Sequence, residues 1–198
     1  MRVGISVLFV AVLGAVVFLA SPSASLPESE NYSVDPVHST VLFRINHAGV
    51  SNFYGRFNEI KGDFTVAEGG TGSVSVTIPV ESADTANEKR DDHLKSPDFF
   101  SAEQFPEITF KSDAVKNTGG NKYDAKGTLT MHGVSKEVTV ALERIGTKDL
   151  GEKMGGIRTG FEGTVTIKRS DFGMKYGIDM GMLGDEIKLI LGIEGIRK

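Results

Sequence analysis

A two-residue alternation of apolar and polar side chains recurs along this chain and constrains its fold more than any other feature. In the clearest run, residues 73–80, every second residue is Val or Ile and the residues between are Ser, Thr or Pro. Because successive side chains of a β-strand point to opposite faces, this run predicts a strand with one buried face. Comparable strands are expected at residues 41–46, 55–66, 107–115, 122–131, 137–143, 159–167 and 187–194. The chain is therefore expected to hold about eight strands.

Glycine-rich breaks separate the predicted strands. Residues 68–72 (EGGTG), 117–121 (NTGGN) and 132–133 (HG) have the composition of tight turns, and the chain contains 24 glycines among 198 residues. Short connections place consecutive strands side by side and antiparallel. The predicted fold class is all-β, since eight antiparallel strands in one domain close as a barrel or stack as a sandwich.

The first 25 residues have the organisation of an export leader. Met1-Arg2 is a short positive start, residues 3–20 carry no charge, and residues 21–25 are small residues with one Pro. The prediction is a cleaved signal peptide at 1–25, a flexible lead-in at 26–31 and one domain at 32–198. The apolar run is 18 residues long, which leaves an uncleaved N-terminal anchor as the alternative. Both versions place the domain outside the cytoplasm, in the periplasm or secreted.

Composition excludes several classes of function. The absence of Cys removes disulfides, thiol nucleophiles and cysteine-held metal clusters, and a net charge of −4 argues against nucleic-acid binding. The sequence has no G-x-S-x-G elbow, Walker loop or H-E-x-x-H motif, so no enzymatic activity and no cofactor are expected. The four histidines, His38, His47, His93 and His132, lack the spacing of dedicated ligands, so no metal site is expected.

One stretch departs from the strand pattern. Residues 81–104 are rich in charge and lack alternation, which predicts a helical connection between the third and fourth strands. Ser82 or Asp84 is the expected N-cap, and Pro97 is expected to end the helix. A second short helix is expected to begin at Asp98. A long connection in a compact domain is often functional, so this one is expected to lie over one end of the strands.

Five motifs together resemble the YceI-like family of polyisoprenoid-binding proteins. They are residues 32–43 (YSVDPVHSTVLF), 90–100 (RDDHLKSPDFF), 105–110 (FPEITF), 127–134 (GTLTMHGV) and 169–173 (RSDFG), in the family's order. The resemblance extends over residues 32–196. It implies an eight-stranded antiparallel lipocalin-like barrel with a hydrophobic tunnel. The implied ligand is a polyprenyl phosphate, a quinone or a fatty amide, held as a carried or sequestered lipid.

The candidate head-group residues are Arg90, Asp92, His93, Arg169 and Asp171. Arg90 is suited to a bidentate phosphate contact and His93 to a hydrogen bond. The alternative for the first three is a solvated helix face with Arg90 paired to the aspartates, and for the last two it is turn chemistry. Because the aspartates would repel a phosphate, a neutral head group is as well suited as an anionic one.

The resemblance also assigns the inward-facing residues to the lining of the tail, with ordinary core packing as the alternative. They are Val41, Phe43, Phe64, Val76, Ile78, Phe110, Leu129, Val140, Phe161, Val165 and Leu189. Met174, Met180 and Met182 in the loop before the last strand are expected to be filler packing more than a lid. Expected partners are the lipid, a second copy at an open barrel end, and a membrane touched transiently. Two other functions stay open: a filled barrel serving as an envelope stress-associated interaction module, and a hydrolase of lipid head groups.

Overall fold

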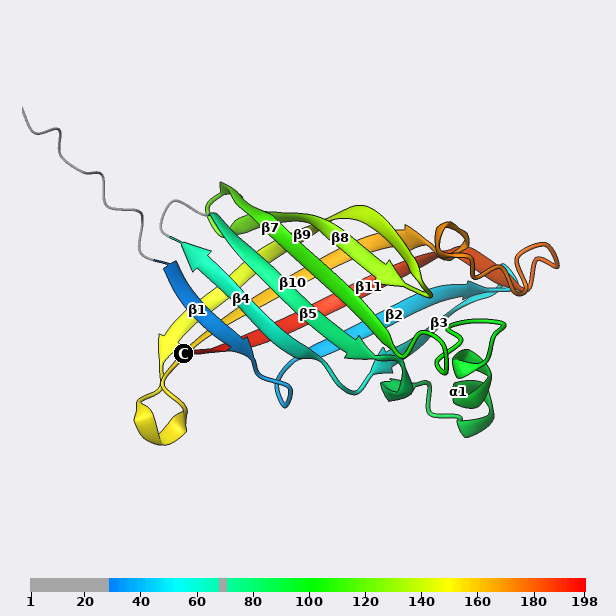
Figure 1. Ribbon diagram of the computed structural model, residues 1–198, viewed down its shortest axis with the longest axis horizontal. Helices are drawn as coiled ribbons and strands as arrows, with labels where there is room; N and C mark the ends of the chain where they lie inside the picture. The colour runs from blue at the N-terminus through cyan, green and yellow to red at the C-terminus, as the bar shows by residue number, and fades with distance from the viewer. Residues whose placement is uncertain (1–28, 68–70) are drawn as a thin grey trace, which may run out of the picture.

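The computed structural model describes residues 29–67 and 71–198, and one antiparallel sheet of eleven strand segments dominates it (Figure 1). The predicted leader at 1–25 and the turn residues 68–70 lie outside the described residues. The segments are β1 (Ser29–Val34), β2 (Thr40–His47), β3 (Ser51–Phe57), β4 (Lys61–Ala67), β5 (Thr71–Pro79), β6 (Ala83–Asp84), β7 (Glu107–Gly119), β8 (Lys122–Met131), β9 (Val134–Asp149), β10 (Ile157–Lys168) and β11 (Leu183–Arg197).

These segments make eight long strands that close into a barrel, as predicted. β1 and β2 lie end to end and form one long strand beside β11. β3 and β4 together form the next long strand, in which β3 pairs with β2 and β4 pairs with β1. β5 and β6 form the third, in which β5 pairs with β4 and β6 pairs with β3. The ring continues through β7, β8, β9 and β10 to β11, and the pairing of β1 with β11 closes it. The predicted strand at 55–66 is thus two segments. Residues 29–31, expected in a flexible lead-in, are the first half of β1.

The break between β1 and β2 is held by a cluster of charged side chains around the buried carboxylate of Asp35. Arg158 on β10 donates to the carboxylates of both Asp35 and Glu194, and His38 Nδ1 lies 2.9 Å from Asp35 Oδ2. Burial alone would raise the pKa of the Asp35 carboxyl, but hydrogen bonds from His38, the Val37 N–H and Arg158 lower that pKa to about 2. The cluster therefore ties the β1–β2 break to β10 and β11 with a carboxylate that stays ionised.

The connection between the third and fourth long strands contains the helix α1 (Glu88–Lys95), which lies over one end of the barrel (Figure 1). Its N-cap is Asn87, whose side chain accepts from the Arg90 N–H at 3.1 Å, and not the predicted Ser82 or Asp84. Residues 80–82 form a 3₁₀ turn, and residues 83–84 pair with β3 as β6, so neither predicted cap is free to start a helix. The second helix expected at Asp98 is a series of turns. Among residues 29–67 and 71–198, no helix has the length and apolar character needed to cross a membrane.

Side-chain alternation puts large apolar groups inside the ring. At the end remote from α1, Tyr32 stacks on Phe64 with ring centroids 5.2 Å apart, and Phe161 packs edge-on against Phe64 and Tyr123. All four of these aromatic side chains are buried. The end that carries α1 is lined differently, and the site described next opens there.

Candidate functional site

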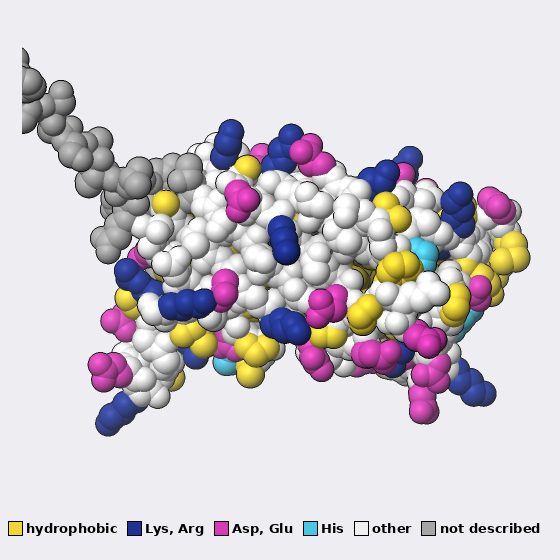
Figure 2. Space-filling model, in the orientation of Figure 1, with side chains coloured by type: hydrophobic (Ala, Val, Ile, Leu, Met, Phe, Trp, Pro, Cys, Tyr) yellow, Lys and Arg dark blue, Asp and Glu magenta, His cyan; other side chains and the backbone are white. Residues whose placement is uncertain are grey.

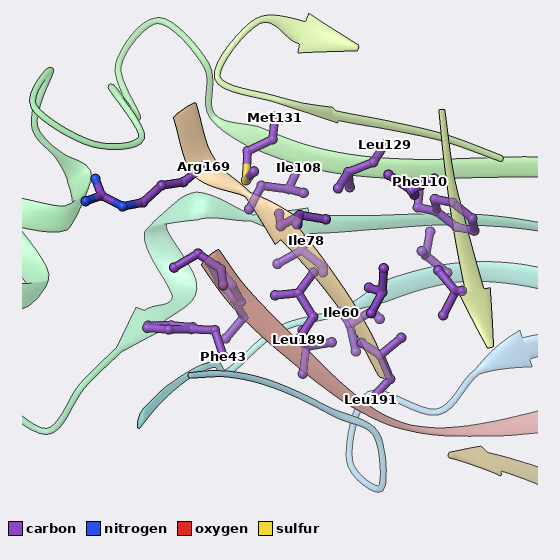
Figure 3. Close-up of a pocket in the computed structure, with 18 of the residues that line it drawn as sticks. Phe43, Ile60, Ile78, Ile108, Phe110, Leu129, Met131, Arg169, Leu189 and Leu191 are labelled. Carbon is purple, nitrogen blue, oxygen red and sulfur yellow. The ribbon is translucent and has the colours of Figure 1, made fainter. Parts of the chain in front are cut away.

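The barrel encloses an elongated cavity of about 660 Å³. This volume lies in the range of protein sites that hold small organic ligands, roughly 300–1,000 Å³. Its wall is largely Val, Ile, Leu, Phe and Met from β2 to β5 and β7 to β11, with α1 and the loop before β11 at one end. Figure 3 shows Arg169 at one end of this lining and Phe110 and Leu191 toward the other. A filled interior, one of the open alternatives, is inconsistent with this cavity.

Each of the eleven residues proposed as tail lining borders this cavity. They are Val41, Phe43, Phe64, Val76, Ile78, Phe110, Leu129, Val140, Phe161, Val165 and Leu189. Their common orientation follows from strand geometry, because residues of one parity share one face of a strand and a closed ring has a single inner face. The cavity can therefore exclude water from an apolar chain along most of its length.

His93 on α1 lies at the mouth of the cavity within a cluster of aromatic rings. Its ring packs edge-on against Phe99 and Tyr176, with centroid distances of 5.0 and 4.9 Å. Nε2 lies 2.9 Å from Asp98 Oδ2. In the described part of the chain, no hydroxyl group is hydrogen-bonded to His93, so the Ser–His pair that a head-group hydrolase would use is not assembled here.

Arg90 lies on the same face of α1 and also borders the cavity. Its Nε and Nη2 donate to the hydroxyl and carbonyl of Thr85, at 2.8 and 2.6 Å, and its guanidinium lies 4.2 Å from the centroid of Phe53. The alternative of a solvated helix face predicted an ion pair between Arg90 and the neighbouring aspartates. Within the described residues Arg90 forms no ion pair. Asp91 accepts from Thr85 instead, and Asp92 is exposed and does not border the cavity.

Arg169, the first residue of the 3₁₀ turn that follows β10, borders the cavity and is 2% exposed. It donates Nε to the carbonyl of Gly184 at 2.8 Å, and its Nη atoms donate to the carbonyls of Met174 and Leu183 at 3.3 and 3.2 Å. Burial lowers the pKa of the Arg169 guanidinium. Asp171 is exposed and does not border this cavity. Of the two head-group candidates in the 169–173 motif, the cavity lining therefore includes Arg169 alone.

The loop at residues 173–182 forms the other side of the mouth. Met174 is buried as filler packing predicts, but Met180 and Met182 are 64% and 48% exposed while also bordering the cavity. Tyr176, which no sequence motif singled out, joins this loop to His93. Figure 2 shows hydrophobic side chains exposed at this end of the molecule. Adaptable apolar side chains therefore surround the opening.

A cluster of potential metal ligands lies away from the cavity, at the β1–β2 break. One ligand atom each of Asp35, His38 and Glu194 lies within 4.8 Å of the others. Arg158 Nη1 donates to both carboxylates, at 2.6 Å to Glu194. The guanidinium therefore supplies the positive charge that these carboxylates require.

The fold and the cavity define a class: a closed antiparallel β-barrel that surrounds one long apolar chamber, with arginine and histidine side chains among the apolar residues of its mouth. The model of the YceI-like domain matches residues 32–195, and the chain belongs to that family. A UPF0312 protein of Pseudomonas aeruginosa PAO1 is 40% identical over 190 residues, which cover 94% of this chain and 95% of the relative. The crystal structure of Burkholderia cenocepacia BcnA superimposes with a TM-score of 0.73 at 27% identity, over 81% of this chain and 98% of that one. A polyisoprenoid binding domain from Saccharophagus degradans has the same fold, with a TM-score of 0.65 at 15% identity over 88% of this chain and all of that one.

Proposed function

We propose that this protein binds one long-chain lipid, an isoprenoid or a fatty-chain compound, and carries or sequesters it without chemical change. The observation that carries the proposal is the 660 Å³ chamber with its apolar wall. Burial of a chain there gains roughly 0.8 kcal/mol per methylene. This gain does not depend on direction or on the tail's exact structure, so several related tails are expected to bind. The polyisoprenoid binding described for the Saccharophagus degradans domain supports the isoprenoid class.

Native mass spectrometry of gently purified protein tests the proposal. The expected spectrum contains protein with one added lipid of several hundred daltons, and the added mass disappears after delipidation. A C20 isoprenoid should then restore one equivalent. Protein that carries no lipid before delipidation and takes up neither an isoprenoid nor a fatty chain afterwards would refute the carrier function.

The predicted leader at residues 1–25 supports a further part of the proposal, that the protein is exported from the cytoplasm. A charged start, an uncharged run over residues 3–20 and a small-residue exit support export, with cleavage near residue 25. N-terminal sequencing of the protein isolated from cell fractions tests this point. A mature chain that begins after the small residues is expected in the exported fraction, whereas an intact Met1 terminus in the cytoplasmic fraction would contradict it.

Loading of the chamber is proposed to take place during transient contact with a lipid surface. The exposed side chains of Met180, Met182 and Val50, on loops at the mouth end, support this step. Vesicle flotation with neutral lipid is the test, because apolar insertion does not require anionic lipid. The double substitution Met180→Ser/Met182→Ser should reduce flotation and slow lipid uptake. Unchanged uptake from vesicles would show that the lipid enters by another route.

A further inference from the structure

The wall of the barrel is not hydrogen-bonded along its whole length between β9 and β10 (Figure 1). Within the described residues, the ladder that joins these two strands ends at the pair Thr164–Ala141. Beyond that pair, residues 165–168 of β10 stay paired with β11, and residues 134–140 of β9 stay paired with β8. These two stretches are called the seam here. They adjoin each other without strand pairing, at the end of the barrel that carries the mouth.

A second cavity, of about 320 Å³, lies at the seam. Six of its lining residues, 136–138 and 166–168, come from the two unpaired stretches. Val138 and Ile167 border this seam cavity and also the chamber. These two residues would be opposite each other if the register of the ladder continued. The chamber and the seam cavity therefore share a partition that includes two apolar side chains.

The lining of the seam cavity changes character from the inside of the barrel to the outside. Ile167 is buried, and so is Phe172, whose carbonyl lies 2.9 Å from Nδ1 of His132 on the turn between β8 and β9. Lys136 and Lys168, in contrast, border the seam cavity with exposed side chains. The seam cavity is thus apolar beside the chamber and charged toward the solvent.

The seam is a place where the wall can be parted with little disruption. Along the paired part of β9 and β10, separating the strands would break ladder hydrogen bonds and leave backbone N–H and C=O groups unpaired. At the seam there is no ladder to break, and the packing of Val138 and Ile167 against the core has to move. An apolar chain that passes between these two side chains keeps them out of water, so it replaces much of the packing that is lost.

We infer that the seam is a lateral extension of the mouth, a slot through which the apolar tail of a lipid enters and leaves sideways when Val138 and Ile167 move apart. This inference rests on the proposed lipid-binding function and adds the route by which the tail passes. A tail that enters through a slot can move in along its length, whereas a tail that enters end-on must first leave its lipid surface. The sideways route therefore exposes less apolar surface to water during transfer.

The absence of Cys from the chain allows the seam to be tethered selectively. Thr139→Cys/Thr166→Cys introduces two thiols at exposed positions that would be opposite each other in the continued register. A short bis-maleimide with a cleavable disulfide in its spacer then joins β9 to β10 across the seam. If this double variant does not fold, Lys136→Cys/Lys168→Cys, at two exposed positions that border the seam cavity, replaces it.

Stopped-flow fluorescence with a fluorescent fatty-chain probe measures the rates of uptake and release. The tether across the seam should slow both rates at least fivefold and leave the Kd within twofold, because a barrier common to entry and exit does not change the equilibrium. Reduction of the spacer should restore the rates of the untethered protein.

Glu143→Cys/Glu162→Cys is the matched control, because these exposed residues are already paired in the ladder of the same two strands. The same tether at this position should change neither rate. Unchanged rates with the tether across the seam, or equal slowing by both tethers, overturn the inference and leave the carrier function intact. If the untethered parent protein takes up no probe, the carrier function itself is refuted.

Discussion

A larger side chain deep in the chamber should weaken the binding of long lipid tails and leave the binding of short tails unchanged. Ala125 on β8 is fully buried and borders the cavity, six residues along the strand from Met131 at the mouth end. Six residues of strand span roughly 20 Å. A C10 isoprenoid chain is roughly 10 Å long at bond lengths near 1.5 Å, so it ends before Ala125, whereas a C20 chain reaches it.

The expected magnitude follows from the volume that the new side chain occupies. Ala125→Leu adds three carbon atoms to the wall and displaces about as many carbons of a C20 ligand. At roughly 0.8 kcal/mol per methylene the loss is about 2.4 kcal/mol. One factor of ten in Kd corresponds to about 1.4 kcal/mol, so C20 binding should weaken roughly 50-fold. C10 binding should change by less than twofold.

Probe displacement with C10 and C20 isoprenoid phosphates provides the measurement. Ala141→Leu on β9 is the control, because it makes the same chemical change at an exposed position. If Ala125→Leu weakens the binding of C10 and C20 ligands equally, or leaves the binding of the C20 ligand unchanged, the tail does not run from the mouth to this depth. Thermal unfolding of Ala125→Leu separates a filled chamber from a misfolded barrel.

Three further predictions concern the scaffold. Asp35→Asn should lower stability at pH 7 by on the order of 2 kcal/mol, because the folded-state pKa of about 2 lies below the ordinary carboxyl pKa of 3.8. That contribution is present above about pH 4 and is lost as pH falls toward 2, so urea unfolding should show the variant and the parent converging in acid; a constant difference would contradict it. Gly55→Ala should destabilise by about 1–3 kcal/mol, since a Cβ there would lie 2.2 Å from Phe43 Cζ, whereas Gly146→Ala, with no atom within 4 Å, should leave the melting temperature nearly unchanged. Asn87→Ala should cost about 1 kcal/mol of helix stability and speed amide exchange in α1 but not in the barrel, and uniform acceleration would argue against a capping role.

The alternation pattern predicted the barrel interior well because it depends on a local rule. Val76, Leu129 and Val140 each belong to runs in which parity alone decides which side faces inward. The same rule does not predict where a strand is interrupted. The break at Asp35 depends on Arg158, which is 123 residues away in the chain, and no local pattern records that contact.

The mouth was predicted in part, and the omissions have geometric causes. Arg90 and His93 are three residues apart and therefore share a helix face, whereas Asp92 lies about 200° around the helix from Arg90. Applying helical spacing to the motif would have removed Asp92 from the candidate head-group residues. Tyr176 reaches His93 across 83 positions of sequence, and only the folded chain brings them together.

The position of β11 in the ring has a consequence for how the chain acquires its fold. β11 is hydrogen-bonded to β10 on one side and to both β1 and β2 on the other, so it joins the earliest described strands to the latest. A nascent chain that lacks residues 183–197 can form hairpins but cannot close the barrel, because contacts so distant in sequence are made late. Premature termination before β11 therefore leaves an open sheet with two unpaired edges, which is a substrate for aggregation and for quality-control proteases.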